Sequence, residues 1–430
     1  MTKVKKNTVY ILTLAMIIYS SLIYAQEKLS YLPFSTNTPL DLDILLNFAH
    51  ENSFELKSAY TNWLAVKEKA PQVSVLPDPK LTYGIVMVRT DKQAQKVSIA
   101  QTFPWFGKLD LKEKLAIKEA EAVYQDYVNR KFQLIGRIKN IFYEYAYLAQ
   151  AVKINTEHQD ILKAMEEIAN IRSKVGSINQ NVLIRIQIEQ GKIEDRIKEL
   201  ERIRPAISYK IYSLIGSKQL NEVLPWPNIT SLKATSISDD KLKELLRNKN
   251  PNLRKINALY EKETQALNLA KKNFYPDVTL SLERDFMDMG DDQTIAMFSI
   301  NLPIWRSSLK AAEYEVIKKR ESLSLSLKDQ ENQLSAQMDL LLYYLRDAER
   351  KANLYRNTLI PKAKQAIEIA FKEFETGKAT FLDILDTERS LLEFQLTEAR
   401  QVTNRYQQLA EIETLIGSDI SQALTLITDK

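Results

Sequence analysis

The chemistry open to this sequence is mainly that of carboxylates. Cysteine is absent, and the two histidines, His50 and His158, stand far apart. These absences exclude thiolate catalysis, disulfides, cysteine-ligated metals and a lipid-bearing cysteine, and they argue against histidine catalysis. The sequence also lacks G-x-S-x-G, Walker and H-E-x-x-H motifs. We expect a protein that is not an enzyme, with no catalytic residue, no cofactor and no metal site.

Two aspartates follow a predicted chain reversal at helical spacing. Asp383 and Asp386 are three residues apart and follow Gly377, so they lie on one face of a helix that begins just after a chain reversal. Taken alone, these residues are typical of ordinary helix N-terminal acids, each favoured by the helix dipole by ~0.3–1 kcal/mol.

An internal repeat sets the order of the elements that carry these residues. Gly176 and Gly377 are 201 residues apart, and a Leu-Ile-Gly-Ser run recurs at the same distance. Two proline-containing motifs and an asparagine recur at distances of 199 and 198 residues. Landmarks that recur in one order at nearly one distance indicate a tandem duplication. The recurring features are 214–217 and 415–418, 76–78 and 275–277, 103–105 and 302–305, and Asn52 and Asn250.

Each half of the repeat has the same elements. A helical pattern covers residues 40–70 and 241–272. Two runs that alternate apolar and polar residues follow in each half, and this period of two predicts four strands of roughly ten residues with one apolar face. Helical patterns fill the rest, and Pro205 and Pro361 are expected to kink or break them. The predicted fold class is mainly α with a small β part, built from a duplicated helix–strand–strand–helix–helix unit.

The longest predicted helix covers residues 109–175, which contain one glycine and no proline. At 1.5 Å per residue such a helix is about 100 Å long. Its apolar residues recur at steps of four and three, the spacing of a coiled coil, and the second half repeats the pattern. Because helical patterns resume at 181–215 and 381–416, Gly176 and Gly377 mark tight reversals between antiparallel helices. The apolar seams are Leu134, Ile138, Ile141, Tyr145, Leu148 and Val152, and Leu341, Leu345, Ala348, Ala352, Tyr355 and Leu359.

The first 25 residues predict a cleaved secretory signal. Three lysines precede an uncharged stretch, 9–23, which is shorter than the ~20 residues that a helix needs to cross a bilayer. No later run is long and apolar enough for a transmembrane helix, so we expect an exported chain. Without the three lysines the chain is nearly neutral, and no basic block with interleaved aromatic residues occurs, so nucleic acid is not an expected partner.

The predicted strands have the length of membrane-crossing β-strands, which is about ten residues at a tilt of ~45°. Lipid does not tolerate open sheet edges, and four strands are too few to close a barrel, since the smallest barrels have about eight. Other copies of the chain would have to complete the sheet, and three copies would give twelve strands. The alternative is a small soluble sheet beside a coiled coil.

Several runs in the second half resemble the C-terminal half of the TolC-type outer-membrane efflux channels. These runs are Pro361-Lys362-Ala363, 374–377, 381–386 and 415–417. The duplication, the Asn-X-Asn-Leu run 250–253 and the Phe-Pro-Trp-Phe-Gly-Lys run 103–108 are similar to that family as well. Each motif is weak alone, but their order and spacing are specific, and the resemblance covers nearly all of the chain after the signal.

The resemblance implies a homotrimer with a 12-stranded β-barrel in the cell outer membrane and a trimeric α-helical barrel that extends into the periplasm. The implied partners are a periplasmic adaptor (membrane fusion) protein, an inner-membrane pump of the RND type and outer-membrane lipid. The implied function is the outer-membrane channel of a tripartite efflux pump, a passive exit duct for substrates that the inner-membrane transporter drives. The alternative function is an exported periplasmic coiled-coil adaptor or scaffold protein without a pore.

The resemblance also assigns roles to residues near the two reversals. Asp383 and Asp386 would lie at the periplasmic gate, where the pore is constricted. Carboxylates that form a ring across a trimer attract cations and oppose one another's ionisation, so they can hold a gate. The helix N-terminal interpretation is the alternative. Gly176, Gly377 and Lys378 would form the helix-reversal tips that dock the adaptor. The implied segments are a signal peptide (1–25), a first repeat (26–218), an equatorial linker (219–240), a second repeat (241–418) and a C-terminal tail (419–430).

Overall fold

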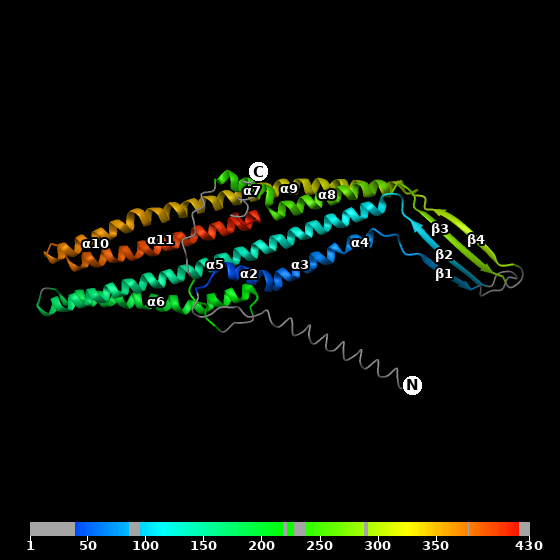
Figure 1. Ribbon diagram of the computed structural model, residues 1–430. Helices are drawn as coiled ribbons and strands as arrows, with labels where there is room; N and C mark the ends of the chain where they lie inside the picture. Colours follow the sequence, from blue (N-terminus) through cyan, green and yellow to red (C-terminus); the bar gives the residue numbers. More distant parts are fainter. Residues whose placement is uncertain are drawn as a thin grey trace, which may run out of the picture. The chain divides into compact units, whose positions relative to one another are not determined.

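The computed structural model describes residues 39–85, 95–176, 178–217, 222–227, 238–287, 291–376 and 378–420 (Figure 1). The described chain consists of long helices and one four-stranded antiparallel sheet, so the predicted fold class is confirmed. It divides into two compact units: a first unit of residues 1–57, 131–243 and 336–430, and a second unit of residues 58–130 and 244–335. The predicted signal peptide and most of the predicted linker and tail lie outside the described residues.

The helical pattern before each pair of strands forms more than one helix. The first pattern forms α2 (Leu42–Asn52), α3 (Phe54–Lys67) and α4 (Lys69–Val73), and the second forms α7 (Asp239–Lys249) and α8 (Pro251–Lys272). None of the described helices combines the length and the apolar character needed to cross a membrane.

Polar caps cause two of these helix breaks. The Ser53 hydroxyl accepts a hydrogen bond from Leu56 N (3.4 Å), and the Asn250 side chain accepts one from Leu253 N (2.9 Å). Each side chain thereby satisfies an N–H group that has no carbonyl partner at a helix start. Pro251 occupies the first turn of α8, where its missing N–H costs nothing. The helical patterns at 40–70 and 241–272 are confirmed, and the sequence analysis did not mark the breaks within them.

Four strands form one sheet in chain order: β1 (Lys80–Ile85), β2 (Gln95–Phe103), β3 (Val278–Phe286) and β4 (Gln293–Ile300). They are six to nine residues long, slightly shorter than predicted. The first hairpin pairs Lys80 with Ala100, and the second pairs Thr279 with Ser299. A shift of 199 residues converts the first pair into the second, so the predicted duplication extends to the strand register.

The longest helix, α5 (Lys108–Lys174), has 67 residues and matches its prediction to within one residue at each end. The helices α6 (Gln180–Ile215) and α11 (Phe381–Ile416) also match. In the α5 seam, four of the six predicted residues are buried, and Ile141 and Val152 are partly buried. In α9 (Arg306–Leu354), Leu345, Ala348 and Ala352 are buried. Seven of the twelve predicted seam residues are therefore buried.

The two prolines in helical patterns have different outcomes. Pro361 follows a π-helical turn, η1 (Tyr355–Leu359), and stands in the first turn of α10 (Ile360–Glu375). In this turn Ile360 N donates to the Tyr355 carbonyl, five residues earlier, which relieves the crowding that a proline ring causes in a regular helix. The predicted interruption at Pro361 is confirmed, whereas α6 continues without a break past Pro205.

The run Pro225-Trp226-Pro227 packs on two helices of the first unit. The Trp226 ring stacks on the Tyr145 ring with 5.1 Å between centroids, and the Arg204 guanidinium lies 4.0 Å from the Trp226 ring centre. Tyr145 OH donates to the Leu224 carbonyl (2.5 Å), and Arg204 Nη2 donates to the same oxygen (2.8 Å). These contacts hold the described part of the predicted equatorial linker against α5 and α6.

Two glycines with left-handed backbones should differ in their tolerance of a side chain. Gly216 (φ 73°) and Gly176 (φ 75°) would both force alanine into a conformation that costs ~1–2 kcal/mol. A Cβ at Gly216 would also lie 2.7 Å from the Asn52 carbonyl oxygen, whereas a Cβ at Gly176 would meet nothing within 4 Å. We expect Gly216→Ala to lower the thermal midpoint in detergent clearly more than Gly176→Ala does. Equal midpoints for the two variants would contradict this packing.

Candidate functional site

One face of the sheet is apolar and exposed. Residues that face each other across antiparallel strands share a face, so Leu81, Ile99, Leu282 and Ala296 form one row across the sheet. Leu81 is 72% exposed, and Phe298 in the next row of β4 is 67% exposed. Contiguous apolar surface of this kind marks contact with lipid or with another protein. The same face includes Tyr83, Ile85, Val97, Leu280, Phe286 and Ile300, and its polar members are Gln95, Gln101, Arg284 and Thr294.

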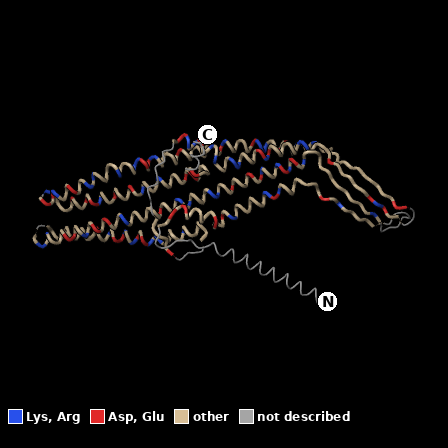
Figure 2. Tube along the Cα trace, viewed as in Figure 1, with Lys and Arg blue, Asp and Glu red and all other residues tan. Residues whose placement is uncertain are grey.

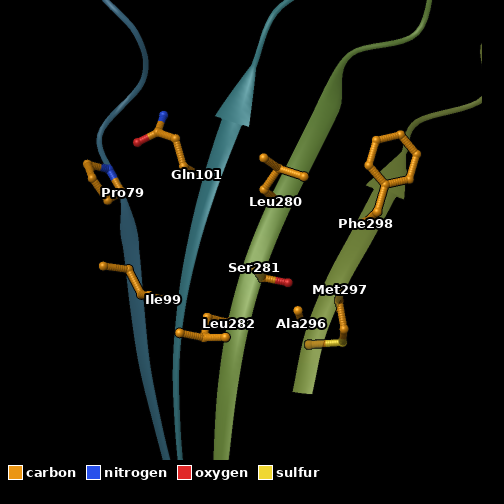
Figure 3. A pocket seen from close by; sticks show the side chains of 9 residues that line it. All are labelled: Pro79, Ile99, Gln101, Leu280, Ser281, Leu282, Ala296, Met297 and Phe298. Atoms are coloured by element: carbon orange, nitrogen blue, oxygen red, sulfur yellow. The ribbon is translucent and has the colours of Figure 1, made fainter. Parts of the chain in front are cut away.

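A shallow hollow of about 540 Å³ lies on the sheet (Figure 3). Its apolar lining includes Ile99, Leu280, Leu282 and Phe298, which come from β2, β3 and β4. An open hollow lined by aliphatic and aromatic groups suits an apolar chain better than a polar solute, because it offers few hydrogen-bonding partners. The hollow therefore agrees with contact between this face and lipid.

The opposite face of the sheet is mainly polar. Thr102 and Thr279 share a hydrogen bond across β2 and β3 (3.0 Å), and Lys96 Nζ lies 3.6 Å from Glu283 Oε2. Ile295 and Met297 depart from the pattern on β4. Charged residues are frequent along the helices and sparse on the strands (Figure 2). Strands with one apolar and one polar face are typical of a sheet that separates lipid from water.

A polar junction fixes the end of β2 and the start of α5 to the start of β3. Asp277 Oδ1 accepts hydrogen bonds from Trp105 N and from Lys108 Nζ, both at 2.8 Å. Lys108 Nζ also donates to the Tyr275 carbonyl (3.1 Å), and Lys108 is only 6% exposed. The Trp105 and Tyr275 rings stack with 5.3 Å between centroids. The Phe-Pro-Trp-Phe-Gly-Lys run is therefore a docking element between the repeats.

The helix-reversal tips lie in the first unit. Gly176 has the left-handed backbone that the predicted reversal requires, and Lys378 N donates to the Glu373 carbonyl (2.8 Å). Gly377 lies outside the described residues. An apolar cluster near the tips joins α5, α6, α10 and α11. Its buried members are Leu162, Met165, Ala169, Ile186, Ile193, Ala370, Phe381, Ile384 and Leu385.

Asp383 forms a capping box with Thr380 at the start of α11. The Thr380 N–H and hydroxyl both donate to Asp383 Oδ2 (2.7 Å each), and Asp383 N donates to the Thr380 hydroxyl (3.4 Å). The hydroxyl bond, and then the backbone bond, lower the pKa of Asp383. Asp386 instead pairs with Arg389 (3.0 Å), which also contacts Glu189 (2.5 Å). Asp383 thus caps the N-terminus of α11. The gate role of both aspartates stays a prediction.

A buried polar cluster was missed by the sequence analysis. His158 of α5 is 2% exposed, and its Nδ1 lies 2.5 Å from Glu388 Oε1 of α11. His158 Nε2 lies 2.6 Å from Gln395 Oε1. Burial alone lowers the pKa of His158, but the contacts with Glu388 and Gln395 outweigh it and leave the pKa raised. The sequence did contain one indication of this cluster: Glu388 is at helical spacing from the apolar residues of α11 that are buried.

Residues 242–418 match the protein family described as Outer membrane efflux protein. The cobalt-zinc-cadmium resistance protein CzcC of Cupriavidus metallidurans is 22% identical over 395 residues, which cover 88% of this chain and 90% of CzcC. The resemblance to the TolC-type outer-membrane efflux channel family is confirmed. The family match supports the expected location in the cell outer membrane and the expectation that the chain is not an enzyme.

Solved outer-membrane channels share the fold. VceC of Vibrio cholerae has a TM-score of 0.70 at 17% identity, with 88% of this chain and 96% of VceC covered. MtrE of Neisseria gonorrhoeae, solved in its open state, has a TM-score of 0.69 at 15% identity, with 90% and 96% covered. CmeC of Campylobacter jejuni has a TM-score of 0.69 at 13% identity, with 93% and 94% covered.

The His158 cluster should make stability depend on pH. Because the folded pKa of His158 is raised, its stabilisation is complete below the unfolded pKa and is lost as the pH rises through the folded pKa. We expect His158→Gln to destabilise the protein by ~1.5–3 kcal/mol at acidic pH and by less at alkaline pH. Thermal midpoints across this range measure the difference. His50→Gln, at an exposed position, is the control, and a pH-independent deficit for His158→Gln would contradict the interpretation.

Proposed function

We propose that this protein is the outer-membrane channel of a tripartite efflux pump and acts as a passive exit duct. One observation carries the proposal: the sheet has an exposed apolar face, a mainly polar opposite face, and an outer edge on β1 and on β4 with no strand neighbour in the described sheet. Such edges are not tolerated in lipid, so other copies must pair with them. A homotrimer would supply twelve strands and close a barrel around a water-filled interior.

The alternative, an exported adaptor or scaffold without a pore, does not account for this sheet. A protein in an aqueous compartment gains nothing from four strands whose apolar side chains are exposed, and it risks aggregation through the open edges. The similarity to outer-membrane channels also favours the channel.

Within this proposal, the five segments keep the boundaries 1–25, 26–218, 219–240, 241–418 and 419–430. The helix-reversal tips at Gly176, Gly377 and Lys378 dock a periplasmic adaptor, and the adaptor connects the channel to an inner-membrane pump of the RND type. The pump supplies the energy, since the described part of the channel offers amphipathic walls and no catalytic constellation. Three tips of each kind in a trimer would present a repeated surface to the adaptor.

The cargo of the system is proposed from the relative CzcC, which is named for cobalt, zinc and cadmium resistance. Divalent cations of this class would pass a wide duct without binding to it. Loss of tolerance to these three cations in a deletion strain, restored by the intact chain, tests this cargo. Unchanged tolerance in that strain would contradict it.

Reconstitution in planar lipid bilayers tests the pore itself. The purified protein should give discrete conductance steps, and it should run as a trimer in SDS before heating and as a monomer afterwards. A monomer without conductance, recovered from the soluble periplasmic fraction, would contradict the channel and favour the scaffold.

The gate prediction needs variants that remove charge and keep the helix cap. Asn in place of Asp383 retains an oxygen that can accept from Thr380, so Asp383→Asn with Asp386→Asn should leave α11 intact. We expect this double variant to raise single-channel conductance and to weaken block by divalent cations, because a ring of carboxylates would be lost. Asp160→Asn, at an exposed position of α5, is the control. Unchanged conductance and cation block would remove the gate role.

A further inference from the structure

The junction between the two repeats contains a pattern that occurs a second time in the sequence. In the first instance an aspartate just before a strand, Asp277, binds the first residue of a long helix, Lys108, at 2.8 Å. The strand that precedes this helix, β2, pairs with β3, the strand that follows the aspartate. This ion pair therefore lies at the end of the strand pair that joins one repeat to the other.

The repeat predicts the second instance. The shift of 199 residues that superimposes the two hairpin registers takes Asp277 to Asp78, which stands just before β1. The helix that follows β4 begins at Arg306, so its first residue is a cation as well. The cation stands three positions after Pro303 in the second repeat and four positions after Pro104 in the first.

Both members of the second instance are unpaired in a single chain. Asp78 and Arg306 are exposed, and neither side chain has a hydrogen-bond or ion-pair partner within the described ranges. Their strands, β1 and β4, are at opposite edges of the sheet, so they cannot pair with each other in one copy. Opposite charges at two complementary edges fit a second copy of this chain.

We propose that Asp78 of one copy pairs with Arg306 of the next copy, at an intersubunit junction of β4 with β1 that reproduces the internal junction of β2 with β3. This inference rests on the proposed homotrimer. It adds a defined register and a defined ion pair to the edges that the homotrimer has to close. A guanidinium can donate two parallel hydrogen bonds to a carboxylate, which favours a fixed geometry at this junction.

The same shift specifies the register of the intersubunit strands. Ile99 pairs with Leu282 in the internal junction, so Phe298 of one copy pairs with Tyr83 of the next. Both side chains lie on the apolar face and are exposed in the single chain. A slip of one residue would place apolar side chains of one copy opposite polar side chains of the other and would break the apolar surface. The charge pair and the strand pattern therefore require the same register.

Disulfide formation tests the register, and the absence of native cysteine makes the test clean. Directly opposed residues in a strand pair have Cβ atoms ~4.5–5.5 Å apart, within reach of a disulfide after small adjustments. We expect the variant Tyr83→Cys with Phe298→Cys to form covalent dimers and trimers in outer membranes under mild oxidation. Leu81→Cys with Ala296→Cys is the control, because this register separates these positions by four residues along the strands. Equal cross-linking of the two variants, or cross-linking of the control alone, would overturn the register.

Charge reversal tests the ion pair. Asp78→Arg and Arg306→Asp should each lower the temperature at which the SDS-resistant trimer dissociates, and the double variant should recover at least about half of that loss, because coupled residues are non-additive. Lys80→Glu, a charge reversal next to the junction, should gain nothing from Arg306→Asp. If the trimer of the double variant dissociates at no higher temperature than those of the single variants, the proposed ion pair is wrong, although the homotrimer is not contradicted. If the wild-type chain forms no trimer and the Tyr83→Cys, Phe298→Cys variant forms no cross-link, the homotrimer is overturned together with the ion pair.

Discussion

Every backbone N–H and C=O group of a β-strand in lipid must have a partner, and this constraint governs the structure. The four strands satisfy it among themselves only at the three internal contacts, and the outer edges of β1 and β4 stay open in the described sheet. The exposed apolar face imposes a second requirement, because removing its side chains from water lowers the free energy of the protein. In the proposed homotrimer, lipid on one face and further copies at both edges would meet the two requirements together.

Because the chain is duplicated, the same structural features are used in both repeats. One hairpin register serves twice, and one type of base contact, an aspartate before a strand with a cation at a helix start, holds the two repeats together through Asp277 and Lys108. Lys108 is buried, so its charge depends on Asp277 and on the Tyr275 carbonyl for compensation. The base of the sheet is therefore fixed by polar contacts at the point where apolar strands give way to helices.

The sequence predicted those features that follow from local periodicity. The alternation of apolar and polar residues predicted all four strands. A long run without proline, with apolar residues at coiled-coil spacing, predicted α5 to within one residue at each end. The breaks at Ser53 and Asn250 were missed because short polar side chains end a helix only when they cap the next one. The contact of His158 with Glu388 was missed because it joins residues that are distant in the sequence, and no local pattern encodes such a pair.

The most direct test of the central claim is the environment of single cysteines along β3, labelled with a polarity-sensitive fluorophore in lipid vesicles. The account predicts that labels at 280 and 282 are quenched by a lipid-soluble quencher, that labels at 279, 281 and 283 are quenched by a water-soluble one, and that the two patterns alternate along the strand. Quenching of all five labels by the water-soluble reagent alone would contradict it, because the apolar face would then not be in lipid.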